Sequence, residues 1–273
     1  MNAMWSATQT PPTAHTGGDG DTAGHAGPVA LLGGHEHRHA TEAIDRALLD
    51  QLGVAAPRVT VLPVASSPRH VGMVAALARN HWTGLGATVR IAMPDAPRLH
   101  QALEAVADAD AIVLPGGVPS RLVAALGASP VWDLALRRWR AGAALSGSSA
   151  GAMSLFAWRL RLYPPSPLDL VPGLGPFDGW VAAPHFRRFR AQLWATPLAR
   201  RFGGLGVLGL DEGTAIVGHN RRFTVVGDGA LTLIEHGRMT VHHAGAQLDL
   251  DLHDRGPVTA PAVTTPPEPA LAA

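Results

Sequence analysis

Short apolar runs alternate with longer amphipathic segments through the first half of the chain. The apolar runs have the length of strands, and the segments between them repeat their apolar positions at helical spacing. Strands are expected at 29–34, 58–64, 87–93, 111–117 and 143–149, and helices at 41–53, 69–82, 97–108 and 119–141, the last broken near 127–130. This alternation is typical of βαβ units, so it predicts an α/β protein with a parallel, doubly wound sheet and helices on both faces.

The pattern changes after the fifth apolar run. The later runs are short, and Gly or Asn turns separate most of them, which is typical of antiparallel strands. They lie at 180–186, 207–217, 222–228, 230–237 and 238–245. We therefore expect antiparallel C-terminal strands added to the parallel sheet, and these offer an exposed edge through which a homo-oligomer could form.

The two ends of the chain have a different composition from the middle. Residues 1–27 and 255–273 consist largely of Gly, Thr, Pro and Ala and have little to bury, so both are predicted to be disordered tails. The remaining span, 28–254, is expected to form a single α/β domain. The chain is 47% hydrophobic over 273 residues, which is sufficient for one large core.

Charge and residue usage exclude several functions. The 22 basic and 21 acidic side chains nearly cancel, so nucleic acid and anionic membranes are not expected as partners. The absence of cysteine removes disulfides, thiolate metal ligands and cysteine nucleophiles. No apolar run approaches the roughly 20 residues of a membrane span, and the start lacks the features of a secretory signal, so a cytoplasmic protein is predicted.

The segment "ALSGSSAGAMSLF" carries the most specific chemical signal. It contains G-x-S-x-G at Gly147, Ser149 and Gly151, between a predicted strand and a helix-forming segment. In a nucleophile elbow this turn is tight, needs small neighbours and presents the serine hydroxyl at a helix N-terminus. The amide of Ala150 could then stabilise an oxyanion. A helix start that uses small residues only for close packing is the alternative interpretation.

Partners for this serine are expected at other strand ends, because ligands gather at the carboxyl edge of parallel sheets. Gly116 and Gly117 end one strand, and their amides could complete an oxyanion hole. His185 is the histidine that ends an apolar run downstream of the elbow and is predicted to lead into a helix. Asp211 and Glu212 flank a further strand, and a hydrogen-bonded turn acid is the interpretation that fits Asp211 better.

Several motifs together resemble the cyanophycinase and dipeptidase E family of serine peptidases. They are "LLGG", "VLPVASS", "IVLPGG", "GSSAGAM", "PGLG" before "HF", and "GLDEGTAIV", and they occur in the family's order across about residues 29 to 245. The resemblance implies a flavodoxin-like fold of the class I glutamine amidotransferase type. It also implies hydrolysis of amide bonds in small peptides or isopeptides through an acyl-enzyme, without a cofactor.

The family's functional positions can be transferred residue by residue. The resemblance places the nucleophile at Ser149, the base at His185, the acid at Glu212, and the oxyanion donors at Gly117 and Ala150. Val118 and Pro119 stand where family members commonly carry a polar pair, and the arginines of "HFRRFRAQ" lie slightly earlier than in the cyanophycinase pattern. The candidate substrate-binding residues are Gly116, Val118, Arg187 and Arg190.

Two other functions are compatible with the sequence. The chain could be a catalytically silent member of the fold that binds a metabolite or a partner protein. Alternatively, the histidines of "HEHRH" could collect a metal ion, although a dedicated site needs fixed geometry. The histidines concerned are His35, His37 and His39, with His25 and the His242–His243 pair elsewhere.

Overall fold

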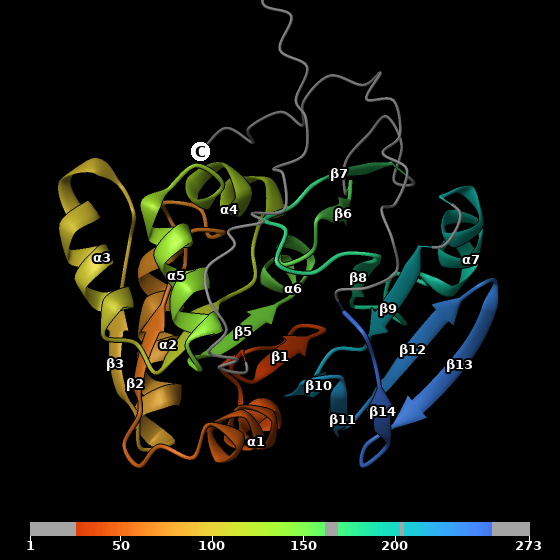
Figure 1. Cartoon of the computed structure of the whole chain (residues 1–273), viewed down its shortest axis with the longest axis horizontal. Coiled ribbons are helices and arrows are strands. Elements are labelled where there is room, and N and C mark those ends of the chain that lie inside the picture. The colour runs from red at the N-terminus through yellow and green to blue at the C-terminus, as the bar shows by residue number, and fades with distance from the viewer. Residues whose placement is uncertain (1–25, 162–168, 203–204, 253–273) are drawn as a thin grey trace, which may run out of the picture.

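The computed structural model describes residues 26–161, 169–202 and 205–252. Its elements are arranged as in Figure 1, with a helix-covered sheet on one side and a smaller sheet beside it. Apart from Ala26 and Gly27, the two predicted tails lie outside the described residues.

The main sheet has eight strands in the order β14-β11-β10-β1-β5-β4-β2-β3. The strands from β1 to β3 in this order are parallel, whereas β10, β11 and β14 are antiparallel additions at the other edge. The parallel strands are β1 (Val29–Leu32), β2 (Arg58–Val61), β3 (Thr88–Ile91), β4 (Ala111–Leu114) and β5 (Ala144–Ser148), and the others are β10 (Thr214–His219), β11 (Arg222–Gly227) and β14 (Gln247–Asp249). The predicted fold class is confirmed.

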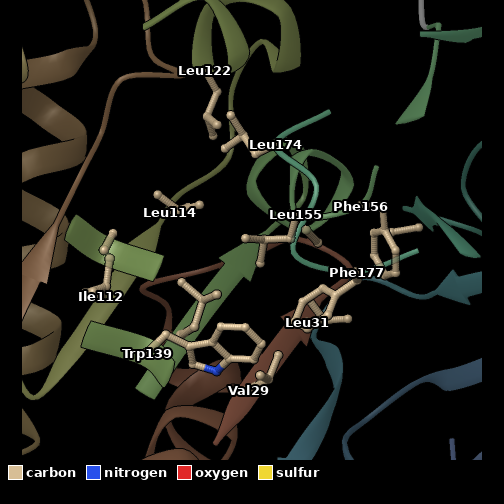
Figure 2. Close-up of a cluster of buried hydrophobic side chains, with 14 of the residues drawn as sticks. Val29, Leu31, Ile112, Leu114, Leu122, Trp139, Leu155, Phe156, Leu174 and Phe177 are labelled. Carbon is tan, nitrogen blue, oxygen red and sulfur yellow. The ribbon is translucent and has the colours of Figure 1, made fainter. Parts of the chain in front are cut away.

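Helices cover both faces of the parallel strands. Successive residues of β1 alternate between two cores: Ala30 and Leu32 pack with α1 and α2, and Val29 and Leu31 pack with α3, α4 and α5. Figure 2 shows the core that contains Val29 and Leu31, where Trp139 and Phe177 meet edge to face. The helices are α1 (Glu42–Leu52), α2 (Val71–Gly84), α3 (Leu99–Ala107), α4 (Pro119–Leu126) and α5 (Pro130–Arg140), with short 3₁₀ turns at His39–Thr41 and Ala96–Arg98.

The predicted helix boundaries have clear local causes. Gly53 ends α1 in the left-handed conformation, at φ 67°, which glycine adopts without steric cost. The expected break in the 119–141 helix separates α4 from α5. There, Ser129 accepts a hydrogen bond from the Val131 amide, and Pro130 occupies the first helical position, where a missing N–H costs little.

A second sheet was not anticipated as a separate unit. The predicted strand 207–217 divides at residues 211–213, because Gly213 turns the chain at φ +66°. Its first part joins the second sheet, where it pairs in parallel with the strand at 180–184, so the antiparallel pairing expected for these two runs is wrong. Its second part pairs with β1 in the main sheet. The second sheet has the strand order β13-β12-β9-β8. Its strands are β8 (Trp180–Pro184), β9 (Gly206–Leu210), β12 (Ala230–Glu235) and β13 (Arg238–His243). This region also contains the hairpin of β6 (Trp158–Leu160) and β7 (Leu170–Pro172), and the helix α7 (Gln192–Arg201).

Candidate active site

Ser149 occupies a strained turn between β5 and the short helix α6 (Ala150–Ser154). Its backbone has φ 48° and ψ −107°, a combination that non-glycine residues rarely adopt. The flanking glycines have no room for a side chain: an ideal Cβ on Gly151 would lie 2.0 Å from the Leu114 carbonyl oxygen, and one on Gly147 would lie 2.8 Å from the Ala152 nitrogen. The turn therefore has the close backbone packing that the G-x-S-x-G pattern predicted.

The structure brings the three predicted triad residues into one hydrogen-bonded row. Ser149 Oγ lies 3.0 Å from His185 Nε2, and His185 Nδ1 lies 2.7 Å from Glu212 Oε1. His185 follows β8, with φ 51°, and its amide donates to the Gly33 carbonyl. Glu212 lies in the turn that connects the two sheets. The row thus joins three strand ends that are far apart in sequence.

Two further basic side chains lie beside the carboxylate of Glu212. Arg188 Nη1 donates to Oε1 at 3.1 Å, and His35 Nε2 lies 3.3 Å from Oε2. Partial burial acts to raise the pKa of Glu212, but hydrogen bonds from His185 and Arg188, and the charges of His35 and His185, outweigh it and lower that pKa below its usual value. The acid of the row is therefore ionised at neutral pH.

The two predicted oxyanion donors lie at the ends of neighbouring strands. Ala150 is the first residue of α6, so its amide has no acceptor within the helix. Gly117 is exposed at φ +140°, and an ideal Cβ there would lie 2.4 Å from the Ala65 carbonyl oxygen. Among the described residues, the Gly117 amide finds no acceptor, whereas the Gly116 amide donates to Glu36 Oε1 at 2.7 Å.

The predicted substrate-binding residues differ in their burial. Val118 is half-buried before α4, and its amide donates to the Ala65 carbonyl at 2.9 Å. Arg187 and Arg190 are exposed. The helix expected directly after His185 is wrong: residues 186–191 form turns, with Arg190 at φ 49°, and α7 begins only at Gln192.

Asp211 has a structural role, although it adjoins Glu212 in sequence. It is buried, and its carboxylate accepts hydrogen bonds from the amides of Arg187 at 3.1 Å and Ala230 at 3.0 Å. The Arg187 side chain pairs with it at 2.7 Å. These contacts match the hydrogen-bonded turn acid that the sequence favoured for this position.

The "HEHRH" run contributes neighbours of the triad that sequence reasoning missed. His35 contacts Glu212, Glu36 contacts the Gly116 turn, and His37 packs on His81 with ring centroids 5.6 Å apart. His39 lies on the surface beside Glu42, 3.1 Å away. Across 26–161, 169–202 and 205–252, no group of three or more ligating side chains could hold a metal ion, and His25 lies outside these ranges.

The sequence did contain a signal for these neighbours. Two residues separate the run from β1, whose carboxyl end adjoins that of β5, so its first polar side chains could be expected near Ser149. Arg188 could not be found in this way, because it reaches Glu212 only through the turns at 186–191.

The fold and the site together have the arrangement of an α/β serine hydrolase. The chain belongs to peptidase family S51, whose family model it matches over residues 29–226, and it is therefore grouped with serine-type peptidases, which are hydrolases. No curated protein shows significant sequence similarity to it.

Solved structures share the fold. A peptidase from an acI-B1 actinobacterium superposes with a TM-score of 0.71 at 24% identity, covering 84% of this chain and 98% of the other. A candidate peptidase E protein from Listeria monocytogenes EGD-e superposes with a TM-score of 0.58 at 16% identity, covering 75% of this chain and all of the other. Within the described part of the chain, no helix is both long and apolar enough to span a membrane.

Proposed function

We propose that this protein hydrolyses amide bonds in small peptides or isopeptides through an acyl-enzyme on Ser149. The observation that carries the proposal is the row from Ser149 through His185 to Glu212, with contacts of 3.0 and 2.7 Å, on a strained strand-to-helix turn. Small peptides and isopeptides are inferred as substrates from the similarity to the cyanophycinase and dipeptidase E family.

In the proposed reaction each member of the row has its own role. Because Glu212 is ionised, it accepts a hydrogen bond from Nδ1–H of His185, which leaves Nε2 unprotonated and able to take the proton of Ser149. The serine oxygen attacks the substrate carbonyl carbon, and the resulting oxyanion is placed near the amides of Gly117 and Ala150. The imidazolium then gives its proton to the departing amine, which leaves an ester on Ser149.

The second half of the reaction repeats the same proton movements. His185 removes a proton from water, the hydroxide attacks the ester carbonyl carbon, and the imidazolium returns the proton to the Ser149 oxygen. The acid product leaves, and the enzyme is restored. Glu212 holds the ring orientation and stabilises the imidazolium in both halves.

Fluorophosphonate labelling tests whether Ser149 is activated. Only an activated serine reacts, and tryptic cleavage after Arg140 and Arg159 places Ser149 in the single peptide 141–159 for mass spectrometry. We expect one adduct, on Ser149, and its loss in Ser149→Ala. A wild-type protein that takes up no label would contradict the proposal and favour a catalytically silent member of the fold.

Ser67 provides a matched control for this experiment. Its hydroxyl lies 2.8 Å from His70 Nδ1 on the surface, so it also has a histidine partner, but its segment lacks the strained turn. We expect Ser67→Ala to label like the wild type. Turnover is then measured on a panel of dipeptides and isopeptides, including aspartyl and β-aspartyl-arginine substrates, with Ser149→Ala as the blank.

A further inference from the structure

The carboxylate of Glu36 bridges two strand ends of the candidate site. Oε1 accepts a hydrogen bond from the Gly116 amide at 2.7 Å, and Oε2 accepts one from Ser148 Oγ at 2.8 Å. Gly116 precedes Gly117, the predicted oxyanion donor, and Ser148 precedes Ser149. One side chain from the loop after β1 therefore ties the residue before the donor to the residue before the nucleophile.

The loop that carries Glu36 is held in an unusual conformation. His35 and His37, on either side of it, have φ values of 66° and 58°. A left-handed conformation costs a non-glycine residue about 1–2 kcal/mol and persists only where the surroundings fix it. Here His35 is held by Glu212 and His37 packs on His81. The side chain between the two histidines is thereby directed into the site.

Gly116 packs closely between Glu36 and Ser149. An ideal Cβ on Gly116 would lie 2.7 Å from Glu36 Oε1 and 3.3 Å from Ser149 Cβ. Since the Gly116 amide also donates to Glu36 Oε1, we expect a change at this carboxylate to move the Gly116–Gly117 turn relative to Ser149. A misplacement of about 1 Å near reacting groups can cost roughly 100-fold in rate.

We propose that Glu36 is a positioning residue, which sets the distance between the oxyanion donors and the nucleophile. The inference rests on the proposed function, because it assumes that Ser149 reacts. A carboxylate suits this role, since both of its oxygens accept hydrogen bonds and its two partners are both donors. In glutamine one of the two oxygens becomes an NH2 group, which would either face the Gly116 amide, another donor, or force the Ser148 hydroxyl to accept where it now donates. In both cases the bridge is altered.

The test is the kinetics of fluorophosphonate labelling of Ser149 in Glu36→Gln. We expect the maximal labelling rate, kinact, to fall about 10- to 100-fold, since one misplaced oxyanion donor is worth about that much. The concentration for half-maximal rate, KI, should change less than about 3-fold, because a misplaced oxyanion donor acts on the bond-forming step and not on the first binding of the reagent. A loss of stability alone would lower the amount of folded protein and leave kinact unchanged.

Two further variants make the experiment specific. Glu42→Gln is the matched control: this glutamate lies six residues further on, is exposed and bonds only to His39 among the contacts described, so kinact should equal the wild-type value. Ser148→Ala removes the second bond alone and should lower kinact by a smaller factor. In the double variant with Glu36→Gln, the losses should not add, because both substitutions break the same contact.

The outcomes separate this inference from the function on which it rests. If the wild type labels at Ser149 and Glu36→Gln keeps kinact within 2-fold, the positioning role is wrong and the proposed function stands. If Glu36→Gln does not fold, Ser148→Ala decides: an unchanged kinact overturns the role. If the wild type itself takes up no label, the proposed function has failed.

Discussion

Gly34 lies directly against the imidazole of His185. An ideal Cβ on Gly34 would be 2.4 Å from Cε1 of the ring and 3.0 Å from each ring nitrogen. Gly34 also has φ +125°, a region that other residues rarely adopt. The end of β1 thus leaves just enough space for the ring that connects Ser149 to Glu212.

Replacing Gly34 with alanine should therefore displace His185. We expect Gly34→Ala to lower the labelling rate of Ser149 at least 100-fold, because the serine loses its base. Gly72→Ala is the control: an added Cβ meets nothing within 4 Å in α2, and alanine is the better helix former. Equal labelling of the two variants would show that the ring tolerates the methyl group.

Replacing the carboxylate with an amide should mainly lower turnover at Glu212 and mainly lower stability at Asp211. Glu212→Gln removes the charge that orients His185 and stabilises the imidazolium, so turnover should fall on the order of 10⁴-fold with little loss of stability. Asp211→Asn turns an N–H group toward donors in a buried site. It should cost about 1–3 kcal/mol of unfolding free energy and leave most of the turnover of the folded protein intact.

Urea unfolding and steady-state turnover, measured on both variants, decide this prediction. If Asp211→Asn lost most of its turnover at full stability, Asp211 would be the catalytic acid and the assignment to Glu212 would be wrong.

The sequence predicted the parts of the fold that depend on local patterns. The period of the apolar runs identified the five parallel strands and their helices, and Ser129 and Pro130 marked the boundary between α4 and α5. The division of 207–217 between two sheets could not be predicted. Apolar periodicity is the same in both sheets, and only Gly213 indicated a turn.

The candidate site also has residues that the sequence predicted and contacts that it could not predict. Ser149, His185 and Glu212 each end or follow an apolar run, so strand ends together with the G-x-S-x-G motif indicated this region of the site. The choice of Glu212 over Asp211 came from the family resemblance. The contacts of Glu36 and Arg188 depend on backbone conformations with positive φ at His35, His37 and Arg190, which have no strong signature in residues other than glycine. The "HEHRH" run therefore suggested a metal site, whereas its three histidines contact three different neighbours, Glu212, His81 and Glu42.

The glycine after the elbow makes the tightest contact of the nucleophile turn. An ideal Cβ on Gly151 would lie 2.0 Å from the Leu114 oxygen and 2.9 Å from the Leu114 carbon, both backbone atoms at the end of β4. We expect Gly151→Ala to lose at least about 2 kcal/mol of unfolding free energy, because Leu114 is held in the main sheet by its pairing with β5 and Gly151 is held in the first turn of α6. Gly84→Ala, which adds a methyl group in open space at the end of α2, should stay within about 1 kcal/mol of the wild type in urea unfolding.

His37 links the conformation of the site loop to pH. Burial lowers the pKa of His37 to about 4; the nearby charge of Glu36 opposes this shift and that of His81 adds to it. His81 itself is buried against Asp45, with Nε2 2.7 Å from the carboxylate, and burial raises the pKa of Asp45 although this hydrogen bond opposes the rise.

The low pKa of His37 predicts a loss of stability in mild acid. An unfolded histidine titrates near pH 6.5, so between about pH 6.5 and 4 the unfolded chain binds a proton at this position and the folded chain does not. Stability is therefore fully present above about pH 6.5 and falls as the pH is lowered toward 4, by up to about 3 kcal/mol from this group. The raised pKa of Asp45 has the opposite effect, because it makes the folded chain bind a proton more readily than the unfolded chain and so adds stability as the pH falls. The experiment must therefore separate the contribution of His37 from that of Asp45.

His37→Asn isolates this contribution, because asparagine tolerates the left-handed conformation and does not titrate. We expect the unfolding free energy of this variant, measured in urea at pH 7, 6, 5 and 4, to fall less steeply than that of the wild type. His39→Asn is the control in the same loop: its side chain is 95% exposed, so the wild-type slope should be retained. If His37→Asn followed the wild-type slope and His39→Asn did not, the acid sensitivity would arise from the surface pair of His39 and Glu42, and the buried ring would contribute nothing to it.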